Sequence, residues 1–200
     1  MQVDMTGKPC KTCKQGVYIE TSLFDDIDGV LHCSACNAEI RRYEDAPEHY
    51  IVCADGACKA NGKQGGGRGG WGAVITLKDG TAVTEVSGGE RATTNNKMEL
   101  TAVIEALSRL PRDSRVEVYT DSQYVVKGMR EWLTGWKKRN WTKADGTAVL
   151  NADLWQKLDS LASMLNVSWH WVKGHAGHPG NERADTLASD AAKNLLLNYI

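Results

Sequence analysis

Four acidic side chains stand in separate stretches of the 200-residue chain, each in a setting that suits a metal ligand. They are Asp55 in YIVCADGAC, Glu99 in TTNNKMEL, Asp121 in VEVYTDSQYV and Asp185 in GHAGHPGNERAD. A carboxylate at a strand end or on the inward face of a helix is costly unless a positive charge meets it. Four carboxylates at one point repel one another, and hard oxygen ligands suit Mg²⁺ or Mn²⁺. These residue types therefore predict a divalent-cation centre, provided that the fold brings them together.

The residues around each acid predict how it is positioned. The apolar run 50–54 and the alternating run 115–120 are typical of strands, and each is followed by an acid, Asp55 or Asp121. If these strands run parallel at the centre of a sheet, ligands collect beyond their carboxyl ends. Glu99 and Asp185 share helical stripes with small residues, which lets each helix lie close to the sheet. A single Asp at a strand end is more often a cap or turn residue, so the prediction depends on the four occurring together.

Apolar periodicity predicts an α/β domain with a mixed sheet. Strands are expected at 50–54, 71–77, 81–87, 115–120 and 167–172, with a hairpin turn at 78–80. Helices are expected at 98–110, 152–165 and about 182–197, with one or two more within 123–137. Asn95 or Asn96, Asn151 and Asn181 are the candidate N-caps of the three long helices. Strands in hairpin order followed by strands separated by helices predict a mixed sheet.

The glycine-rich stretch 65–70 matches a dinucleotide-binding pattern by letter only. It precedes a strand rather than a helix, so the phosphate-binding mechanism of that pattern fails. We therefore expect a flexible loop there.

One stretch of the chain has the composition of a nucleic-acid surface. Residues 127–143 hold six Lys and Arg against a single acid, Glu131, and Trp132, Trp136 and Trp141 are interleaved with them. The whole chain has a net charge of only −1, so it is no general polyanion binder. The stretch therefore predicts a local contact with nucleic acid.

Composition limits the class of protein. The chain is 42% hydrophobic and 24% charged, with a mean hydropathy of −0.42. No apolar run approaches the roughly 20 residues that a membrane-spanning helix needs, and residues 1–16 have no apolar core for a signal peptide. We therefore expect a cytoplasmic protein with no membrane contact, and we expect a monomer.

Two cysteine pairs predict a second, smaller domain over residues 1–46, before a catalytic domain over 47–200. Cys10, Cys13, Cys33 and Cys36 form two C-x-x-C knuckles with nineteen residues between them, the spacing of a zinc ribbon. A domain this small needs such a structural Zn²⁺ to fold. Two disulfides or free thiols are the alternative, which a reducing compartment disfavours. A hairpin is expected around Asp28-Gly29.

Four strings in order carry a resemblance to a known family. TTNNKMEL, TDSQYV, WKKRNW and WVKGHAGHPGNERAD resemble the type 1 ribonucleases H over residues 48–194. The resemblance implies a five-stranded sheet with helices on both faces. It also implies endonucleolytic hydrolysis of the RNA strand of an RNA–DNA hybrid, leaving 5′-phosphate and 3′-hydroxyl ends.

The resemblance also assigns the reacting groups. Two Mg²⁺ ions, with Mn²⁺ as an alternative, are implied at the four acids, with Asp55 shared between the ions. Two such ions suit phosphodiester hydrolysis. His175, ten residues before Asp185, is implied as the auxiliary histidine that accepts or shuttles a proton from a loop. A solvent-exposed loop histidine without a role is the alternative.

Substrate contacts are expected in two places. Telling RNA from DNA requires contacts to the 2′-hydroxyl, and amide side chains can both donate and accept. Near the acids these are Asn61, Asn95, Asn96 and Gln123, although Asn95 and Asn96 are alternatively only helix caps. The basic stretch resembles the family's protrusion that grips the DNA strand, through Trp132, Lys137, Lys138 and Arg139.

Two other functions share some of these features. A related nuclease that cleaves or joins DNA would use the same carboxylates but has no need of the TTNN, WKKRNW and GHAGH elements. A binding module without catalysis would lack at least one acid, and none is missing. Residues 1–46 carry a net charge of −3, and protein docking, substrate choice and stabilisation remain open as their role.

Overall fold

The computed structural model describes residues 18–20, 30–33, 35, 39–41, 48–59 and 67–195. Residues 1–48 and 49–200 form two compact units, which are treated separately. In the described part of the chain no helix is both long and apolar enough to span a bilayer.

The first unit contains a small antiparallel sheet. Strands β1 (Tyr18–Glu20), β2 (Val30–Cys33) and β3 (Glu39–Arg41) pair in that order. Tyr18 faces Cys33 and Val30 faces Arg41. The antiparallel pairing of β1 with β2 is the arrangement that the Asp28-Gly29 turn signal predicts.

The second unit is built on a five-stranded mixed sheet in the order β6-β5-β4-β7-β8. Strands β4 (His49–Lys59), β5 (Gly67–Leu77) and β6 (Ala82–Thr93) are antiparallel neighbours. Strands β7 (Arg115–Thr120) and β8 (Asn166–Trp171) join β4 in parallel. The mixed five-stranded sheet expected from the sequence is confirmed.

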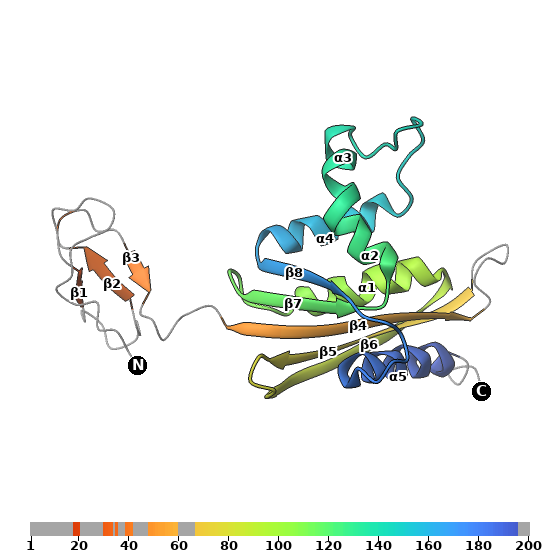
Figure 1. Cartoon of the computed structure of the whole chain (residues 1–200), viewed down its shortest axis with the longest axis horizontal. Helices are drawn as coiled ribbons and strands as arrows, with labels where there is room; N and C mark the ends of the chain where they lie inside the picture. Colours follow the sequence, from red (N-terminus) through yellow and green to blue (C-terminus); the bar gives the residue numbers. More distant parts are fainter. Residues whose placement is uncertain are drawn as a thin grey trace. The chain divides into compact units, whose positions relative to one another are not determined.

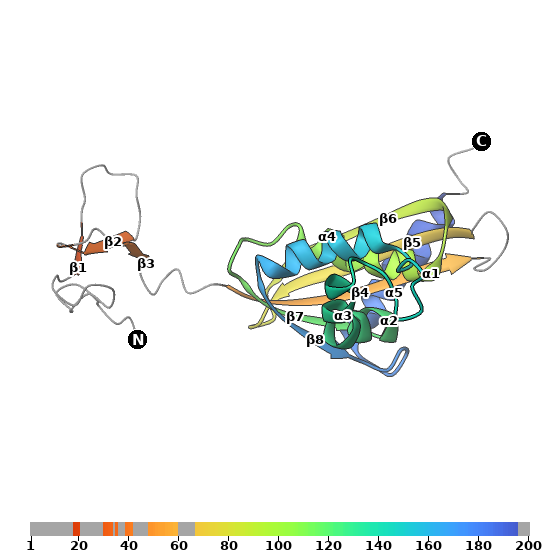
Figure 2. The same cartoon turned by 90° about the horizontal axis from the view of Figure 1, so that it is seen from above.

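Helices cover both faces of this sheet (Figure 1). On one face lie α1 (Asn95–Leu107) and α4 (Ala152–Ser163), and on the other lies α5 (Pro179–Asn194). Seen from above, α1 and α4 lie over the strands and α5 lies behind them (Figure 2). The core between sheet and helices includes Trp155, Ile75, Leu100 and Val52, all at most 1% exposed.

A chain of short helices leaves the domain between β7 and α4. Helix α2 (Gln123–Lys127), the π-helical segment η2 (Gly128–Trp132) and α3 (Leu133–Lys138) follow one another, and α3 stands away from the sheet in Figure 1. The amide of Leu133 bonds to the carbonyl of Gly128, five residues earlier, which widens the turn. A Cβ on Gly128 would lie 2.0 Å from the ring of Trp155, so this turn passes directly over that indole. Residues 123–150 are called the protrusion below.

Two predicted helix starts are wrong. Thr94, not Asn95 or Asn96, caps α1, because its Oγ1 accepts from the Lys97 amide at 3.4 Å. His178, not Asn181, caps α5, because its Nδ1 accepts from the Asn181 amide at 3.3 Å. Proline has no amide to satisfy and suits the first helical position, so Pro179 starts the helix three residues earlier than predicted.

Asn151 occupies the N-cap position of α4 but does not cap it through its side chain. The backbone φ of Asn151 is 59°, and its side-chain Nδ2 donates to the hydroxyl of Tyr124 at 3.3 Å. The backbone carbonyl of Asn151 accepts from the Trp155 amide instead. The predicted position is therefore right, but the predicted capping bond is not made.

The glycine-rich stretch is also different from its prediction. Gly67–Gly70 are the first residues of β5, where a flexible loop was expected. A Cβ on Gly70 would lie 2.1 Å from the carbonyl oxygen of Ala188, and one on Gly72 2.6 Å from that of Ala184. Glycine is required here because the backbone of α5 lies against the strand, and this contact brings the start of α5 towards the acids.

Candidate active site

Asp55 and Asp121 come from the neighbouring parallel strands at the centre of the sheet. Asp121 directly follows β7, as predicted. Asp55 lies inside β4, so the prediction that it ends a strand is wrong. The parallel pairing of β4 with β7 stops at Cys53 and Tyr119, whereas the antiparallel pairing with β5 continues to Lys59. Asp55 is therefore just beyond the point where its pairing with the neighbouring strand β7 ends.

Glu99 enters from the first turns of α1. A Cβ on Gly56 would lie 2.3 Å from the amide nitrogen of Glu99, so β4 and α1 touch through their backbones here. This contact is possible only because Gly56 has no side chain. It places the carboxylate of Glu99 next to that of Asp55.

Three of the four predicted acids meet. Asp55, Glu99 and Asp121 each offer a carboxylate oxygen, and these oxygens all lie within 4.8 Å of one another. Asp55 and Glu99 are buried, at 7% and 6% exposed. Glu99 Oε2 is buried and has no hydrogen-bond partner among the residues that the structure describes. Hard oxygen donors gathered without a counter-charge fit a divalent cation of the Mg²⁺ type.

Burial and mutual repulsion act on the proton affinity of this cluster. Burial is the largest cause that raises the pKa of Asp55 to about 7; repulsion from Asp121 and Asp185 adds to it, and the Gly56 amide and His175 act in the opposite direction. The Gly56 amide donates to Asp55 Oδ1 at 2.7 Å. Burial also raises the pKa of Glu99 well above its usual range, with Asp55 and Asp121 adding to it. Both groups therefore need a nearby cation to stay ionised at neutral pH.

Asp185 is close to this cluster but outside the group of three. It lies on α5, its side chain is 33% exposed, and Ser189 Oγ lies 3.5 Å from its Oδ1. Its effect on the pKa of Asp55 shows that the two carboxylates are close enough to repel. Of the four predicted acids, Asp185 is therefore the one that lies outside the group of three, with its side chain partly in contact with solvent.

His175, on the loop between β8 and α5, lies beside Asp185 of α5. Its Nδ1 is 3.7 Å from Asp185 Oδ2, and its side chain is 79% exposed. The residue has a φ of 52°, which few residues other than glycine adopt. The sequence placed His175 near the acids, and the structure brings it to Asp185.

The start of the same loop touches Asp121. A Cβ on Gly174 would lie 2.4 Å from Asp121 Oδ2, so the α-carbon of Gly174 packs against that carboxylate. Trp171, the last residue of β8, donates from Nε1 to the backbone oxygen of Asp121 at 3.0 Å. Sequence reasoning missed Gly56, Gly174 and Trp171, because their roles depend on which residue they face across the fold. The glycines next to Asp55 and His175 were the available signal.

The side-chain amides predicted to contact the substrate lie in different positions relative to the acids. Asn95 donates from Nδ2 to Glu99 Oε1 at 3.0 Å, so it belongs to the carboxylate cluster. Asn96, the next residue of α1, is partly buried, and Gln123 is exposed at the start of α2. Asn61 lies outside the described residues.

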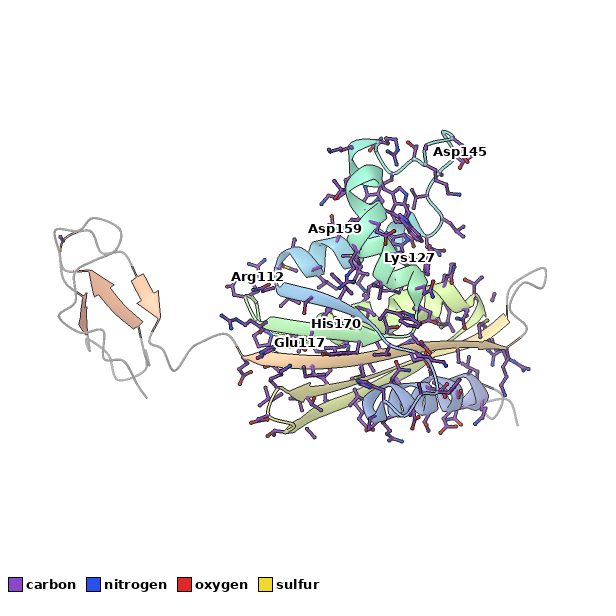
Figure 3. The ribbon with its side chains drawn as sticks, viewed as in Figure 1. Arg112, Glu117, Lys127, Asp145, Asp159 and His170 are labelled. Carbon is purple, nitrogen blue, oxygen red and sulfur yellow. The ribbon has the colours of Figure 1, made fainter. Side chains whose placement is uncertain are left out.

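The predicted protrusion residues fall into two groups. Trp132 is half-buried and belongs to a ring cluster, 6.2 Å from Tyr124 and 5.6 Å from Trp136 between centroids. Lys138 and Arg139 are exposed. Lys137 Nζ, however, lies 2.7 Å from Asp159 Oδ2 of α4, so this lysine already has an anionic partner. Figure 3 shows Asp159 on α4, Lys127 on α2 and Asp145 in the loop after α3.

The predicted zinc ligands cannot be placed. Cys10, Cys13 and Cys36 lie outside the described residues, as does the side chain of Cys33.

Comparison with known proteins identifies the family. The RNase H family model matches residues 47–193. A ribonuclease H of Cupriavidus pinatubonensis is 57% identical over 148 residues, which cover 74% of this chain and 98% of the relative. A ribonuclease H of Ralstonia nicotianae is 60% identical over 142 residues, which cover 71% and 90%. The chain belongs to the ribonuclease H family, and the resemblance found in the sequence is confirmed.

Solved structures agree in fold. The crystal structure of LC9-RNase H1, a type 1 RNase H with the type 2 active-site motif, matches with a TM-score of 0.65 and 38% identity, covering 74% of each chain. LC11-RNase H1 in complex with an RNA/DNA hybrid matches with a TM-score of 0.54 and 25% identity, covering 74% of this chain and 99% of that one. The expectation of an enzyme of the ribonuclease H type is confirmed.

Proposed function

We propose that this ribonuclease H hydrolyses the RNA strand of RNA–DNA hybrids internally, leaving 5′-phosphate and 3′-hydroxyl ends. The observation that carries the proposal is the meeting of Asp55, Glu99 and Asp121 oxygens within 4.8 Å. The substrate follows from the similarity to LC11-RNase H1, which binds an RNA/DNA hybrid. Cleavage or joining of DNA by the same carboxylates is the alternative that the substrate test below addresses.

We propose that Asp55, Glu99, Asp121 and Asp185 hold two Mg²⁺ ions, or two Mn²⁺ ions. By the family resemblance Asp55 would be the carboxylate shared by both ions, and one of its oxygens lies within 4.8 Å of oxygens of Glu99 and Asp121. When bound, the ions activate the attacking water and neutralise the charge that grows on the phosphate.

The chain's own residues orient the reaction. The backbone contact of Gly56 with α1 fixes Asp55 and Glu99 relative to each other. Asn95 holds one oxygen of Glu99, and the other oxygen, Oε2, receives no hydrogen bond from the described residues. His175, exposed beside Asp185, accepts or shuttles a proton at the reacting phosphate.

Substrate recognition is proposed on both sides of the acids. Asn61, Asn95, Asn96 and Gln123 are the amide side chains for the 2′-hydroxyl and base edges. The protrusion provides Lys138 and Arg139 for phosphates of the DNA strand and Trp132 for stacking. Lys137 reaches a phosphate only after it leaves Asp159, so its contribution is smaller than that of Lys138.

Cleavage of defined substrates tests the proposal. Labelled RNA–DNA hybrid, double-stranded DNA and single-stranded RNA are incubated with the full chain, with Mg²⁺, with Mn²⁺ or with EDTA. We expect cleavage of the RNA in the hybrid that EDTA abolishes, with 3′-hydroxyl ends on the products. Cleavage of DNA alone, or cleavage that survives EDTA, would reject it.

The first 46 residues are proposed to form a zinc ribbon separate from the catalytic domain over 47–200. Its ligands are Cys10, Cys13, Cys33 and Cys36, whose spacing supports a tetrahedral thiolate site. A thiolate site of this kind suits a reducing compartment, and we propose that the protein is cytoplasmic. We further propose that it is a monomer and that the ribbon binds a protein partner. One equivalent of zinc in the purified protein, lost when the four cysteines are replaced by serine, is the expected result of metal analysis.

A further inference from the structure

The loop that carries His175 is held at both of its ends. At its start, Gly174 packs against Asp121 Oδ2. At its end, the amide of Gly177 donates to Glu182 Oε1 at 2.9 Å. His175 lies between these two points, and no function has yet been given to Glu182.

His175 cannot be positioned by burial, because its side chain is 79% exposed. The loop backbone is also locally unfavourable. His175 has a φ of 52° and Gly177 a φ of 83°, so two of four residues are in the left-handed region. Glycine adopts this region freely, whereas a residue such as His175 is disfavoured there. Such a conformation persists when contacts elsewhere fix it.

Glu182 comes from an ordered element. It lies in the first turn of α5, and its own amide bonds to the carbonyl of His178 at 3.0 Å. Its carbonyl accepts from Thr186 Oγ1 at 2.9 Å. The carboxylate therefore projects from a fixed backbone and holds the amide of Gly177, two residues after His175. Asp185, the partner of His175, lies three residues further along the same helix.

We infer that Glu182 is a positioning residue, which holds the loop so that His175 stays beside Asp185. The inference rests on the proposed role of His175 in hydrolysis. Glu182 acts through its hydrogen bond to the loop backbone and does not touch the substrate. A carboxylate in the first turn of a helix also interacts favourably with the helix dipole. That interaction would stabilise α5 without positioning the loop.

The test compares five variants of the full chain on a labelled RNA–DNA hybrid: Glu182→Ala, Glu182→Gln, His175→Ala, the double variant Glu182→Ala with His175→Ala, and Asp190→Ala. A glutamine oxygen still accepts from the Gly177 amide, but glutamine has no charge for the dipole. Asp190 is an exposed acid of the same helix that bonds Lys193 and lies away from the loop, so it is the matched control.

We expect Glu182→Ala to lower kcat roughly threefold to tenfold, the effect of one hydrogen bond, with KM nearly unchanged. Glu182→Gln restores most of this loss, and Asp190→Ala behaves as the wild type. In the His175→Ala background, removal of Glu182 has no further effect, because the residue it positions is gone.

Four results would overturn the inference. They are unchanged kcat in Glu182→Ala, an equal loss in Glu182→Gln, an equal loss in Asp190→Ala, and the same fold-loss in the His175→Ala background. Thermal unfolding of each variant shows whether the loss follows stability instead. If His175→Ala itself cleaves normally, the proposed role of His175 fails, and the inference about Glu182 fails with it. If His175→Ala loses activity and Glu182→Ala does not, only the inference fails.

Discussion

The two sides of the active site are built differently. Asp55 and Glu99, the closed side, are buried where β4 touches α1 through Gly56. Asp185 and His175, the open side, are 33% and 79% exposed and lie on α5 and on the loop before it. Burial raises the pKa of both carboxyls on the closed side. The closed side is thus organised to need a cation, whereas the open side remains in contact with water, from which a substrate arrives.

The first prediction compares one acid from each side. Asp55→Asn should lower hybrid cleavage on the order of a thousandfold or more, because it removes the buried carboxylate that we propose is shared by both ions. Asp185→Asn should cost only about ten- to a hundredfold, since water can replace a ligand at an exposed position. Both are measured as kcat/KM at saturating Mg²⁺. Equal losses would mean that the open and closed sides contribute alike.

The second prediction concerns stability without metal. The folded pKa of Asp55 is about 7 against an ordinary 3.8, so the folded state binds more protons than the unfolded state between these values. The contribution of Asp55 to the free energy of unfolding in EDTA should therefore be fully present below about pH 4 and be lost as the pH rises towards 7. Mg²⁺ should reverse this loss, with a larger gain at pH 8 than at pH 5.

Thermal unfolding at several pH values, with EDTA and with Mg²⁺, measures this dependence. The matched control is Asp55→Asn, which should show a shallower fall because only Glu99 of the closed side then titrates. A wild-type protein whose stability in EDTA does not change from pH 4 to pH 7 would contradict the assigned burial.

The third prediction links the open side to a ligand. Gly174→Ala places a Cβ against Asp121 Oδ2, at 2.4 Å unless one of them moves. We expect activity at low Mg²⁺ to fall about tenfold and to recover in part at high Mg²⁺, because a displaced ligand binds the ion more weakly. The Mg²⁺ dependence of hybrid cleavage measures this. An unchanged Mg²⁺ dependence would show that the loop start does not constrain Asp121.

The fourth prediction uses the two neighbouring lysines of the protrusion. Lys138 is exposed, whereas Lys137 is paired with Asp159 at 2.7 Å. Lys138→Ala should weaken hybrid binding about threefold at low salt and reduce the salt dependence by about one counterion, since one phosphate contact is lost. Lys137→Ala should change binding less, because its charge is already balanced by Asp159. Equal effects in a salt titration of binding would assign Lys137 to the substrate as well.

The sequence predicted more of the closed side than of the open side. The apolar strands and helical stripes were sufficient for the order of the sheet, and three of the four acids proposed as ligands do meet. Burial fixes Asp55 and Glu99, and burial is what hydrophobic patterns report. Asp185 was expected in the same group; it lies close enough to Asp55 to raise its pKa, but it is outside the group of three and its side chain is 33% exposed.

The failures share a physical cause. Thr94 and His178 cap helices because their side chains face free amides, and the sequence only names several candidates for that place. Gly67–Gly70 begin a strand although glycine itself favours no element, and within it Gly70 packs against α5 whereas Gly69 faces Thr93 and Met98. The Lys137–Asp159 pair likewise joins residues from α3 and α4. In each case the outcome was decided by which groups face each other in the fold, three residues apart for the two caps and further apart for the strand and the ion pair. Hydrophobic patterns do not report such contacts.

The last and smallest expected effect is that of removing residues 1–46. Relatives such as that of Cupriavidus pinatubonensis are covered to 98% by a match of 148 residues, so the catalytic fold is complete without the first unit. Both sides of the active site also lie within residues 49–200. We therefore expect a chain of residues 47–200 to keep kcat and KM on a short hybrid within about twofold, the scatter of independent sites. If that chain folds, as its thermal unfolding shows, yet loses cleavage, then the first unit supplies part of the site, and the division into a closed and an open side would have to include it.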